Sequence, residues 1–204
     1  MYPKLTIDLK KLNNNIDALA KLTKKASCSM MIVTKCLCAD EVVCKMIMEC
    51  PDVNYLADSR ILNISTYSDI AHLKNKKTVL LRIPMPSEVV EIVKYADLSL
   101  NSEISTIRML NEEAARQGKI HNILLMIDVG DLREGIFYKE EEQIFAVVKE
   151  ILSMKNINLY GVGTNLTCYG AIIPKFDNLS ILVGWAKKIE EKFSIKLEMV
   201  SGGN

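Results

Sequence analysis

The chain has 204 residues, with 26 Lys and Arg against 25 Asp and Glu, so its formal net charge is +1. Hydrophobic residues make up 49% and charged residues 25%, which is typical of a soluble globular protein and excludes intrinsic disorder. A net charge near zero also argues against a protein that binds nucleic acid through bulk electrostatics.

The sequence contains no recognisable targeting signal or membrane-spanning segment. Its start, Met1-Tyr2-Pro3-Lys4, lacks the charged and then apolar pattern of a signal peptide. Its apolar stretches are shorter than the ~18 residues that a membrane span needs. Six cysteines without paired CxxC spacing fit a reducing compartment better than a zinc site. We therefore expect a cytoplasmic protein with no metal and no membrane contact.

Short β-branched or apolar runs alternate along the chain with amphipathic helical patterns. The runs that predict strands are residues 5–9, 29–34, 53–56, 79–83, 98–100, 123–127, 158–162 and 196–200. Two helices are predicted by apolar stripes, namely Leu9, Leu12, Ile16, Leu19 and Leu22, and Leu179, Leu182, Ala186, Ile189 and Phe193. Asp8 and Asn101 are expected as helix N-caps and Gly118 as a helix stop.

The spacing of the runs predicts an α/β fold in one domain, residues 1–204. From the second run onward the strand centres lie about 28 residues apart, which is one βα unit per step and hence a parallel sheet. A doubly wound sheet and a (β/α)8 barrel both fit this pattern. A barrel usually takes about 250 residues, and the sequence stops directly after a strand. We interpret the chain as truncated after its seventh barrel strand.

Four strand ends carry the candidate site residues, because reactive groups in α/β folds lie at the carboxyl ends of parallel strands. Lys35 ends an apolar strand, where a partly desolvated amine can form a Schiff base; a lysine that simply reaches solvent is the alternative. Arg133 lies in the glycine-bracketed loop 128–135. It could orient an anionic group, or the loop could be a self-satisfied Asp–Arg turn.

The two later strand ends are rich in glycine and small polar residues. The segment 161–170 offers Asn165 and Thr167 as hydrogen-bond partners, and its glycines allow a close approach of backbone to a ligand. A tight polar turn is the alternative, and the absence of GxGxxG spacing disfavours a dinucleotide. The last loop, Ser201-Gly202-Gly203-Asn204, exposes backbone N–H groups that suit a phosphate, unless it is a plain chain end.

Together the four strand ends describe an amine nucleophile, a polar middle and an anion cradle. Pyridoxal 5′-phosphate (PLP) needs an amine for its aldehyde and a nest for its phosphate. PLP is therefore the cofactor that these residues predict.

The chain also resembles a known family over its whole length. It is similar to the amino-terminal (β/α)8 TIM-type barrel of the alanine-racemase-like, fold-type III PLP enzymes, and within that group it looks most like the ornithine racemases. The segments that carry the resemblance are residues 2–8, 33–40, 127–135, 163–170 and 201–204. Each motif alone is modest, but their order and spacing together are specific.

The resemblance implies a role for each candidate residue. Lys35 would hold PLP as an internal aldimine and act as a base on one face of the substrate Cα. Arg133 would lie near the cofactor ring, and Asn165 and Thr167 would line the cofactor. The residues Ser201, Gly202, Gly203 and Asn204 would bind its phosphate. The implied activity is racemisation, by two-base Cα proton transfer, of ornithine or a similar basic amino acid in a homodimer.

The resemblance also implies what the chain lacks. Residues 1–9 would form a strand outside the barrel, paired with a carboxy-terminal β-domain that lies beyond Asn204. That domain would supply the second acid or base, so residues 1–204 alone are expected to be inactive. Alanine racemases place a tyrosine shortly after the lysine, whereas Cys36-Leu37-Cys38-Ala39-Asp40 has none, which argues against alanine as the substrate.

Three other functions remain open from the sequence. Single-domain relatives of this barrel bind PLP for cofactor homeostasis without racemase activity. A cofactor-free racemase would use paired cysteine thiolates, with Cys36 or Cys38 facing Cys168. A purely structural barrel would bind no cofactor at all.

Overall fold

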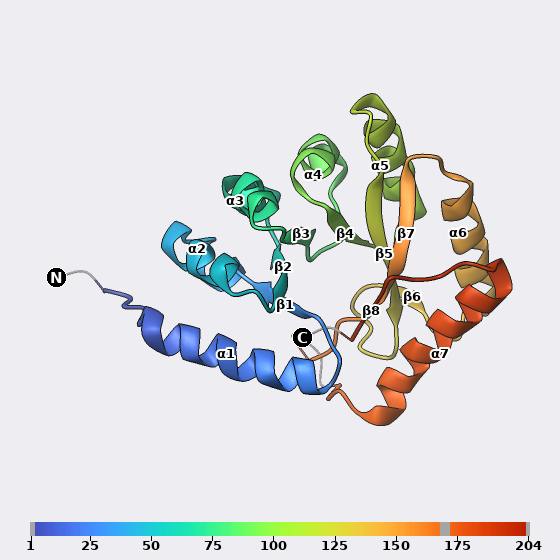
Figure 1. The fold of residues 1–204 in the computed structure, drawn as a ribbon. Helices are drawn as coiled ribbons and strands as arrows, with labels where there is room; N and C mark the ends of the chain where they lie inside the picture. The colour runs from blue at the N-terminus through green and yellow to red at the C-terminus, as the bar shows by residue number, and fades with distance from the viewer. Residues whose placement is uncertain (1–2, 168–171, 203–204) are drawn as a thin grey trace. The chain divides into compact units, whose positions relative to one another are not determined.

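The computed structural model describes residues 3–167 and 172–202. The chain divides into two compact units, Met1–Leu80 and Leu81–Asn204, and in each of them strands alternate with helices (Figure 1). The expectation of one domain over residues 1–204 stays a prediction. None of the helices in the described part combines the length and the hydropathy that crossing a membrane requires.

The first unit is a three-stranded parallel sheet with its helices. In chain order its elements are α1 (Leu9–Lys25), β1 (Met30–Val33), the 3₁₀ turn η1 (Lys35–Leu37), α2 (Glu41–Glu49), β2 (Val53–Asp58), α3 (Ile61–Leu73) and β3 (Lys77–Leu80). The strand order is β1-β2-β3, and both pairings are parallel. Helix α2 packs on β2, and α3 packs on β2 and β3.

The second unit continues the same alternation. Its elements are the 3₁₀ turn η2 (Pro86–Glu88), α4 (Val89–Tyr95), β4 (Leu98–Asn101), α5 (Ile104–Arg116), β5 (His121–Asp128), β6 (Ile136–Phe137), α6 (Glu141–Ser153), β7 (Ile157–Gly163), α7 (Phe176–Phe193) and β8 (Met199–Ser201). The strand order is β4-β5-β7-β8, all parallel, and the short β6 pairs with the end of β5.

The predicted α/β class is confirmed, and seven of the eight predicted runs overlap a strand of the parallel sheets. Seven of the eight residues of β5 are buried, as expected for a strand covered on both faces. The last strand begins at Met199, later than predicted, because the preceding residues are held by the end of α7. There Ile195 N–H donates to the Glu190 carbonyl and Leu197 N–H to the Glu190 side chain.

The expected strand at residues 5–9 is not observed. Residues 3–8 belong to no strand in the described chain, and Leu9 already begins α1. Asp8 is the N-cap of that helix, as predicted, because its carboxylate accepts a hydrogen bond from Lys11 N at 3.0 Å. An extended segment needs a neighbouring strand to satisfy its backbone groups, and the described residues offer this one none.

Asn101 is not the predicted N-cap. It is the last residue of β4, fully buried, and its side-chain amide donates to the carbonyl and the hydroxyl of Ser99. Helix α5 begins three residues later, after Glu103. Gly118 does follow the end of α5 with a positive φ of 65°, which confirms the predicted helix stop.

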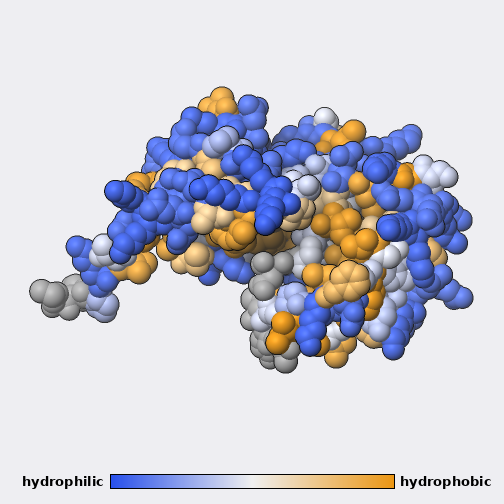
Figure 2. All heavy atoms as spheres, turned by 60° about the horizontal axis from the view of Figure 1, so that its bottom comes forward, coloured by the Kyte–Doolittle hydropathy of each residue, from blue (hydrophilic) through white to orange (hydrophobic). Residues whose placement is uncertain are grey.

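The two predicted apolar stripes differ in burial. On α7, the stripe residues Leu182, Ala186 and Ile189 are buried. On α1, Leu19 is 51% and Leu22 is 64% exposed. Figure 2 shows that apolar side chains lie among polar ones on this side of the molecule. The spacing of the leucines therefore predicts helix α1 correctly, but within the described residues most of its apolar face is not covered.

A histidine is buried inside the second unit. His121 begins β5, is 2% exposed, and has its Nε2 2.8 Å from the Ser99 hydroxyl of β4. Burial lowers the pKa of His121 to about 4, because a charged imidazolium is poorly solvated in the protein interior. His121 is therefore neutral in the folded protein at neutral pH.

Candidate functional site

Lys35 lies at the carboxyl end of β1, as predicted. The preceding residue, Thr34, is buried; its N–H donates to the Ala57 carbonyl at 2.9 Å and its hydroxyl to Asp58 Oδ2 at 2.8 Å. Asp58 ends the neighbouring strand β2 and is fully buried. The backbone before Lys35 is thus fixed to β2, while the lysine side chain itself is exposed.

The loop after β5 folds back onto the strand that precedes it. Asp128 Oδ1 accepts hydrogen bonds from Gly130 N at 2.8 Å and Leu132 N at 3.1 Å. Gly135 has a φ of +113°, and a Cβ there would lie 2.6 Å from Asp128 N, so the fold-back requires glycine. The alternative, a turn in which an aspartate of this loop pairs with Arg133, is wrong. Asp128 binds backbone N–H groups, and Arg133 pairs with Glu134.

Glu134 connects two of the predicted site residues. Its Oε2 pairs with Arg133 Nε at 2.9 Å, and its Oε1 accepts a hydrogen bond from the Asn165 side-chain amide. The Glu134 side chain is 16% exposed and that of Arg133 32%. The structure therefore brings the loop after β5 and the loop after β7 together through one carboxylate.

The glycines at the end of β7 make a close approach to neighbouring protein. A Cβ on Gly161 would clash with the Met199 carbonyl oxygen of β8, and one on Gly163 would lie 3.1 Å from Met126 Sδ. This corrects the expectation that these two glycines open the backbone to a ligand. They instead allow β7 to pack tightly between β5 and β8.

The end of β8 lies beside the loop after β7. The Ser201 carbonyl accepts a hydrogen bond from Thr164 N at 3.0 Å. Ser201, Gly202, Asn165 and Thr167 are all partly exposed. The Thr167 hydroxyl donates to the neighbouring Leu166 carbonyl at 2.7 Å. The second unit thus gathers Arg133, Asn165 and Ser201 at the carboxyl ends of β5, β7 and β8.

Some predicted residues fall outside what can be compared directly. Gly203, Asn204 and Cys168 lie outside the described residues. Lys35 belongs to the first unit, whereas the other described site residues belong to the second. The two described cysteines of the thiolate alternative, Cys36 and Cys38, are exposed and free.

Sequence reasoning missed two acidic residues of the loop after β5. Glu134 stands inside the motif 127–135, and its position next to Arg133 could have suggested an ion pair. Asp131 had no such signal. Both of its carboxylate oxygens are shielded from solvent, and neither has a hydrogen-bond partner among residues 3–167 and 172–202. No group of three His, Cys, Asp or Glu residues suited to a metal ion occurs in that part of the chain.

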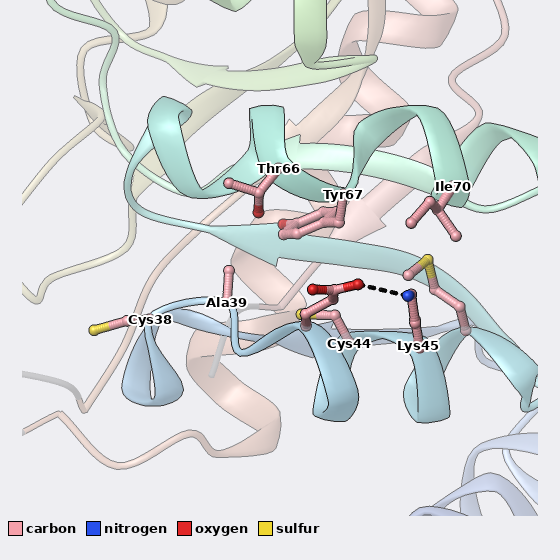
Figure 3. A pocket seen from close by; sticks show the side chains of 9 residues that line it. Cys38, Ala39, Cys44, Lys45, Thr66, Tyr67 and Ile70 are labelled. Atoms are coloured by element: carbon pink, nitrogen blue, oxygen red, sulfur yellow. Dashed lines mark hydrogen bonds and ion pairs between the residues drawn. The ribbon is translucent and has the colours of Figure 1, made fainter.

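A separate hollow of about 270 Å³ lies between α2 and α3 in the first unit (Figure 3). Its lining includes Cys44, Tyr67 and the ion pair between Lys45 and Glu41. Burial, reinforced by Asp40 and Asp58, raises the pKa of the Cys44 thiol to about 11, so this thiol is not a nucleophile at neutral pH. Cys38 of the thiolate alternative lines this hollow, whereas Lys35 and the other residues predicted to bind PLP do not.

Comparison with known proteins identifies the family. The model of the alanine racemase N-terminal domain matches residues 7–204. The chain belongs to this family. Over all of its residues the chain is 47% identical to ornithine racemase of Acetoanaerobium sticklandii, of which it covers 56%, and 32% identical to lysine racemase of Thermotoga maritima, of which it covers 55%. The chain therefore spans about half the length of these two curated relatives.

Solved structures share the fold of this alanine racemase N-terminal domain at low sequence identity. Alanine racemase of Streptomyces coelicolor superposes with a TM-score of 0.76 at 14% identity, over 95% of this chain and 52% of that one. PipY of Synechococcus elongatus with PLP bound gives a TM-score of 0.67 at 11% identity, over 91% of this chain and 87% of that one. The predicted barrel class, the α/β fold of the alanine racemase N-terminal domain, is thereby confirmed.

Proposed function

We propose that the protein is a PLP-dependent racemase of a basic amino acid such as ornithine, with Lys35 as the residue that binds the cofactor. The observation that carries this proposal is an exposed lysine at the carboxyl end of β1 in a chain of the alanine racemase family. The racemase names of the two curated relatives support the reaction, and their substrates, ornithine and lysine, support a basic side chain.

The residues present fit PLP by the chemistry of their donors. An exposed amine suits an aldehyde, and the second unit offers a guanidinium, an amide and a hydroxyl at neighbouring strand ends. Among the described residues, a Cβ on Gly202 would meet Leu179 Cδ2 alone, at 3.5 Å, so the backbone at Gly202 has room for an anion. The carboxylate of Asp131 is shielded from solvent and has no hydrogen-bond partner within residues 3–167 and 172–202, which suits an ammonium group of an amino acid.

Each of these side chains has one task in the proposed reaction. PLP, when bound, supplies an electron sink that makes the Cα–H bond of an attached amino acid acidic. Lys35 removes or returns the proton at Cα on one face, and the Thr34–Asp58 contact fixes the backbone from which it acts. Arg133 and Asn165 orient the bound molecule, and Ser201 with Gly202 binds the phosphate. Racemisation also requires a second group that protonates the opposite face.

Borohydride trapping tests the cofactor and the lysine together. The protein is incubated with PLP, reduced, digested and mapped by peptide mass spectrometry, with Lys35→Ala as the matched variant. We expect one pyridoxyl adduct at Lys35 that decreases when free phosphate competes and that Lys35→Ala lacks. Adducts spread over exposed lysines, or none in a folded protein, would exclude the proposal. Chiral chromatography with L-ornithine, L-lysine and L-alanine then ranks the substrates.

A PLP-binding protein without racemase activity is the second candidate. It is suggested by the likeness in fold to PipY, whose solved structure has PLP bound. The 47% identity to ornithine racemase favours the racemase. An adduct at Lys35 combined with no racemisation by the full-length protein would select the second candidate. The homodimer and the cytoplasmic location stay predictions.

A further inference from the structure

We propose that Glu134 is a positioning residue of the site, and that its carboxylate holds Arg133 and Asn165 in the orientation in which they contact the cofactor. This inference rests on the proposed function. Glu134 lies within the motif 127–135, and the resemblance implies no role for it.

The two contacts use both oxygens of one carboxylate. Oε2 accepts from Arg133 Nε at 2.9 Å, and Oε1 accepts from the Asn165 side-chain amide. An ionised carboxylate is purely an acceptor, so it can receive a donor at each oxygen. The contact also fixes which way the Asn165 amide points, because its nitrogen faces Glu134 and its oxygen is directed away from that contact.

Burial makes this bridge more than a surface ion pair. The Glu134 side chain is only 16% exposed, and ionic hydrogen bonds are stronger where water is largely excluded. The backbone around Glu134 is fixed as well, by the hydrogen bonds of Asp128 and by the close approach of Gly135. Glu134 therefore joins a rigid loop after β5 to the loop after β7, 31 residues further along the chain.

Replacing one carboxylate oxygen of Glu134 with nitrogen removes one of the two acceptors in this bridge. The side chain of Glu134→Gln has one acceptor oxygen and one donor nitrogen. Because Arg133 and Asn165 donate to different oxygens of Glu134, one of them would face the amide nitrogen instead. Glu134→Asp keeps the charge but is one methylene shorter. Glu113 provides a matched control on α5, because it too is a poorly exposed glutamate held by an arginine, Arg116, and an amide, Gln117.

The test compares PLP binding by wild type, Glu134→Gln, Glu134→Asp and Glu113→Gln, measured by absorbance titration well below the unfolding temperature of each variant. We expect Glu134→Gln to raise the PLP dissociation constant about 10- to 100-fold, the usual effect of removing a group that orients a ligand contact. Glu134→Asp is expected between Glu134→Gln and wild type. Glu113→Gln is expected to lower thermal stability without changing PLP affinity.

The outcomes separate this inference from the proposed function. Wild-type affinity in both Glu134 variants, together with an adduct at Lys35, would overturn the positioning role and leave the cofactor assignment intact. Absence of any adduct at Lys35 in wild type would overturn both. If Glu134→Gln does not fold, Glu134→Asp decides, since a raised dissociation constant supports the bridge and a wild-type value rejects it. Reactivity of Arg133 with phenylglyoxal, which should increase in Glu134→Gln, reports the lost contact without PLP.

Discussion

Burial determines the charge of His121 and so connects one residue to the pH dependence of the whole fold. In the unfolded chain a histidine titrates near pH 6.5, whereas burial lowers the pKa of His121 to about 4 in the folded protein. Between these two values the unfolded state binds more protons than the folded state. The free energy of unfolding must therefore decrease as the pH falls through this window.

We predict that His121 alone lowers the free energy of unfolding by about 3 kcal/mol between pH 6.5 and pH 4. Its contribution is fully present above pH 6.5. Urea unfolding at a series of pH values measures the effect. His121→Gln should flatten the dependence. Equal slopes in wild type and His121→Gln would contradict the burial argument.

At the scale of elements, the pairing of β7 with β8 depends on a missing side chain. The backbone of Gly161 faces the Met199 carbonyl of β8 at a distance that leaves no room for a Cβ. At Gly184, within α7, no heavy atom of the described residues lies within 4 Å of the position that a Cβ would occupy. The same substitution should thus have opposite effects at the two glycines.

We predict that Gly161→Ala lowers the free energy of unfolding by about 2 kcal/mol or more, because the strands must separate to admit the methyl group. Gly184→Ala should raise it by about 0.5 to 1 kcal/mol, because alanine restricts the unfolded chain and favours the helix. Thermal and urea unfolding of the two variants check both signs. A neutral Gly161→Ala would show that β7 and β8 can move apart at little cost.

Periodicity in the sequence was enough to predict the elements of the sheets, but side-chain hydrogen bonds moved some of their ends. The runs around β1, β2, β4, β5 and β7 are rich in apolar and β-branched residues, and they predicted strands close to the observed ones. The start of β8 depends on Glu190 of α7, and the position of Asn101 depends on Ser99, and neither contact follows from a local pattern. The strand β6 has two residues, which is too short to give a period.

In the site too, a local sequence pattern predicted the residues, whereas the contacts between distant residues could not be predicted. Lys35, Arg133 and Asn165 could be predicted because each follows an apolar strand within a short polar motif. The bridge through Glu134 joins residues 31 positions apart and depends on how the loops fold back. The lack of room for a Cβ at Gly161 likewise depends on β8, a strand that is distant in the sequence.

For the whole molecule, bound PLP should change the free energy of unfolding and the rate of hydrogen exchange. A ligand that binds only the folded state raises the free energy of unfolding by about 2.7 kcal/mol at 100 times its dissociation constant. We expect PLP to slow hydrogen exchange around β1 and η1 in the first unit and in the loop 129–135 of the second. Hydrogen-exchange mass spectrometry measures the exchange rates of both segments, with Lys35→Ala as the control. Unchanged exchange around β1 and η1 on addition of PLP would contradict the proposed role of Lys35.

The first and last strands in the strand order, β1 and β8, each leave one edge unpaired in the described chain. In the described chain β1 pairs only with β2, and β8 pairs only with β7, so each presents a row of backbone N–H and carbonyl groups on its outer side. Val33 on β1 and Val200 on β8 are 38% and 44% exposed. Apolar edges of this type are templates for strand addition by a second molecule. Self-association of residues 1–204 at high concentration should therefore proceed edge to edge, with a rise in intermolecular β-structure.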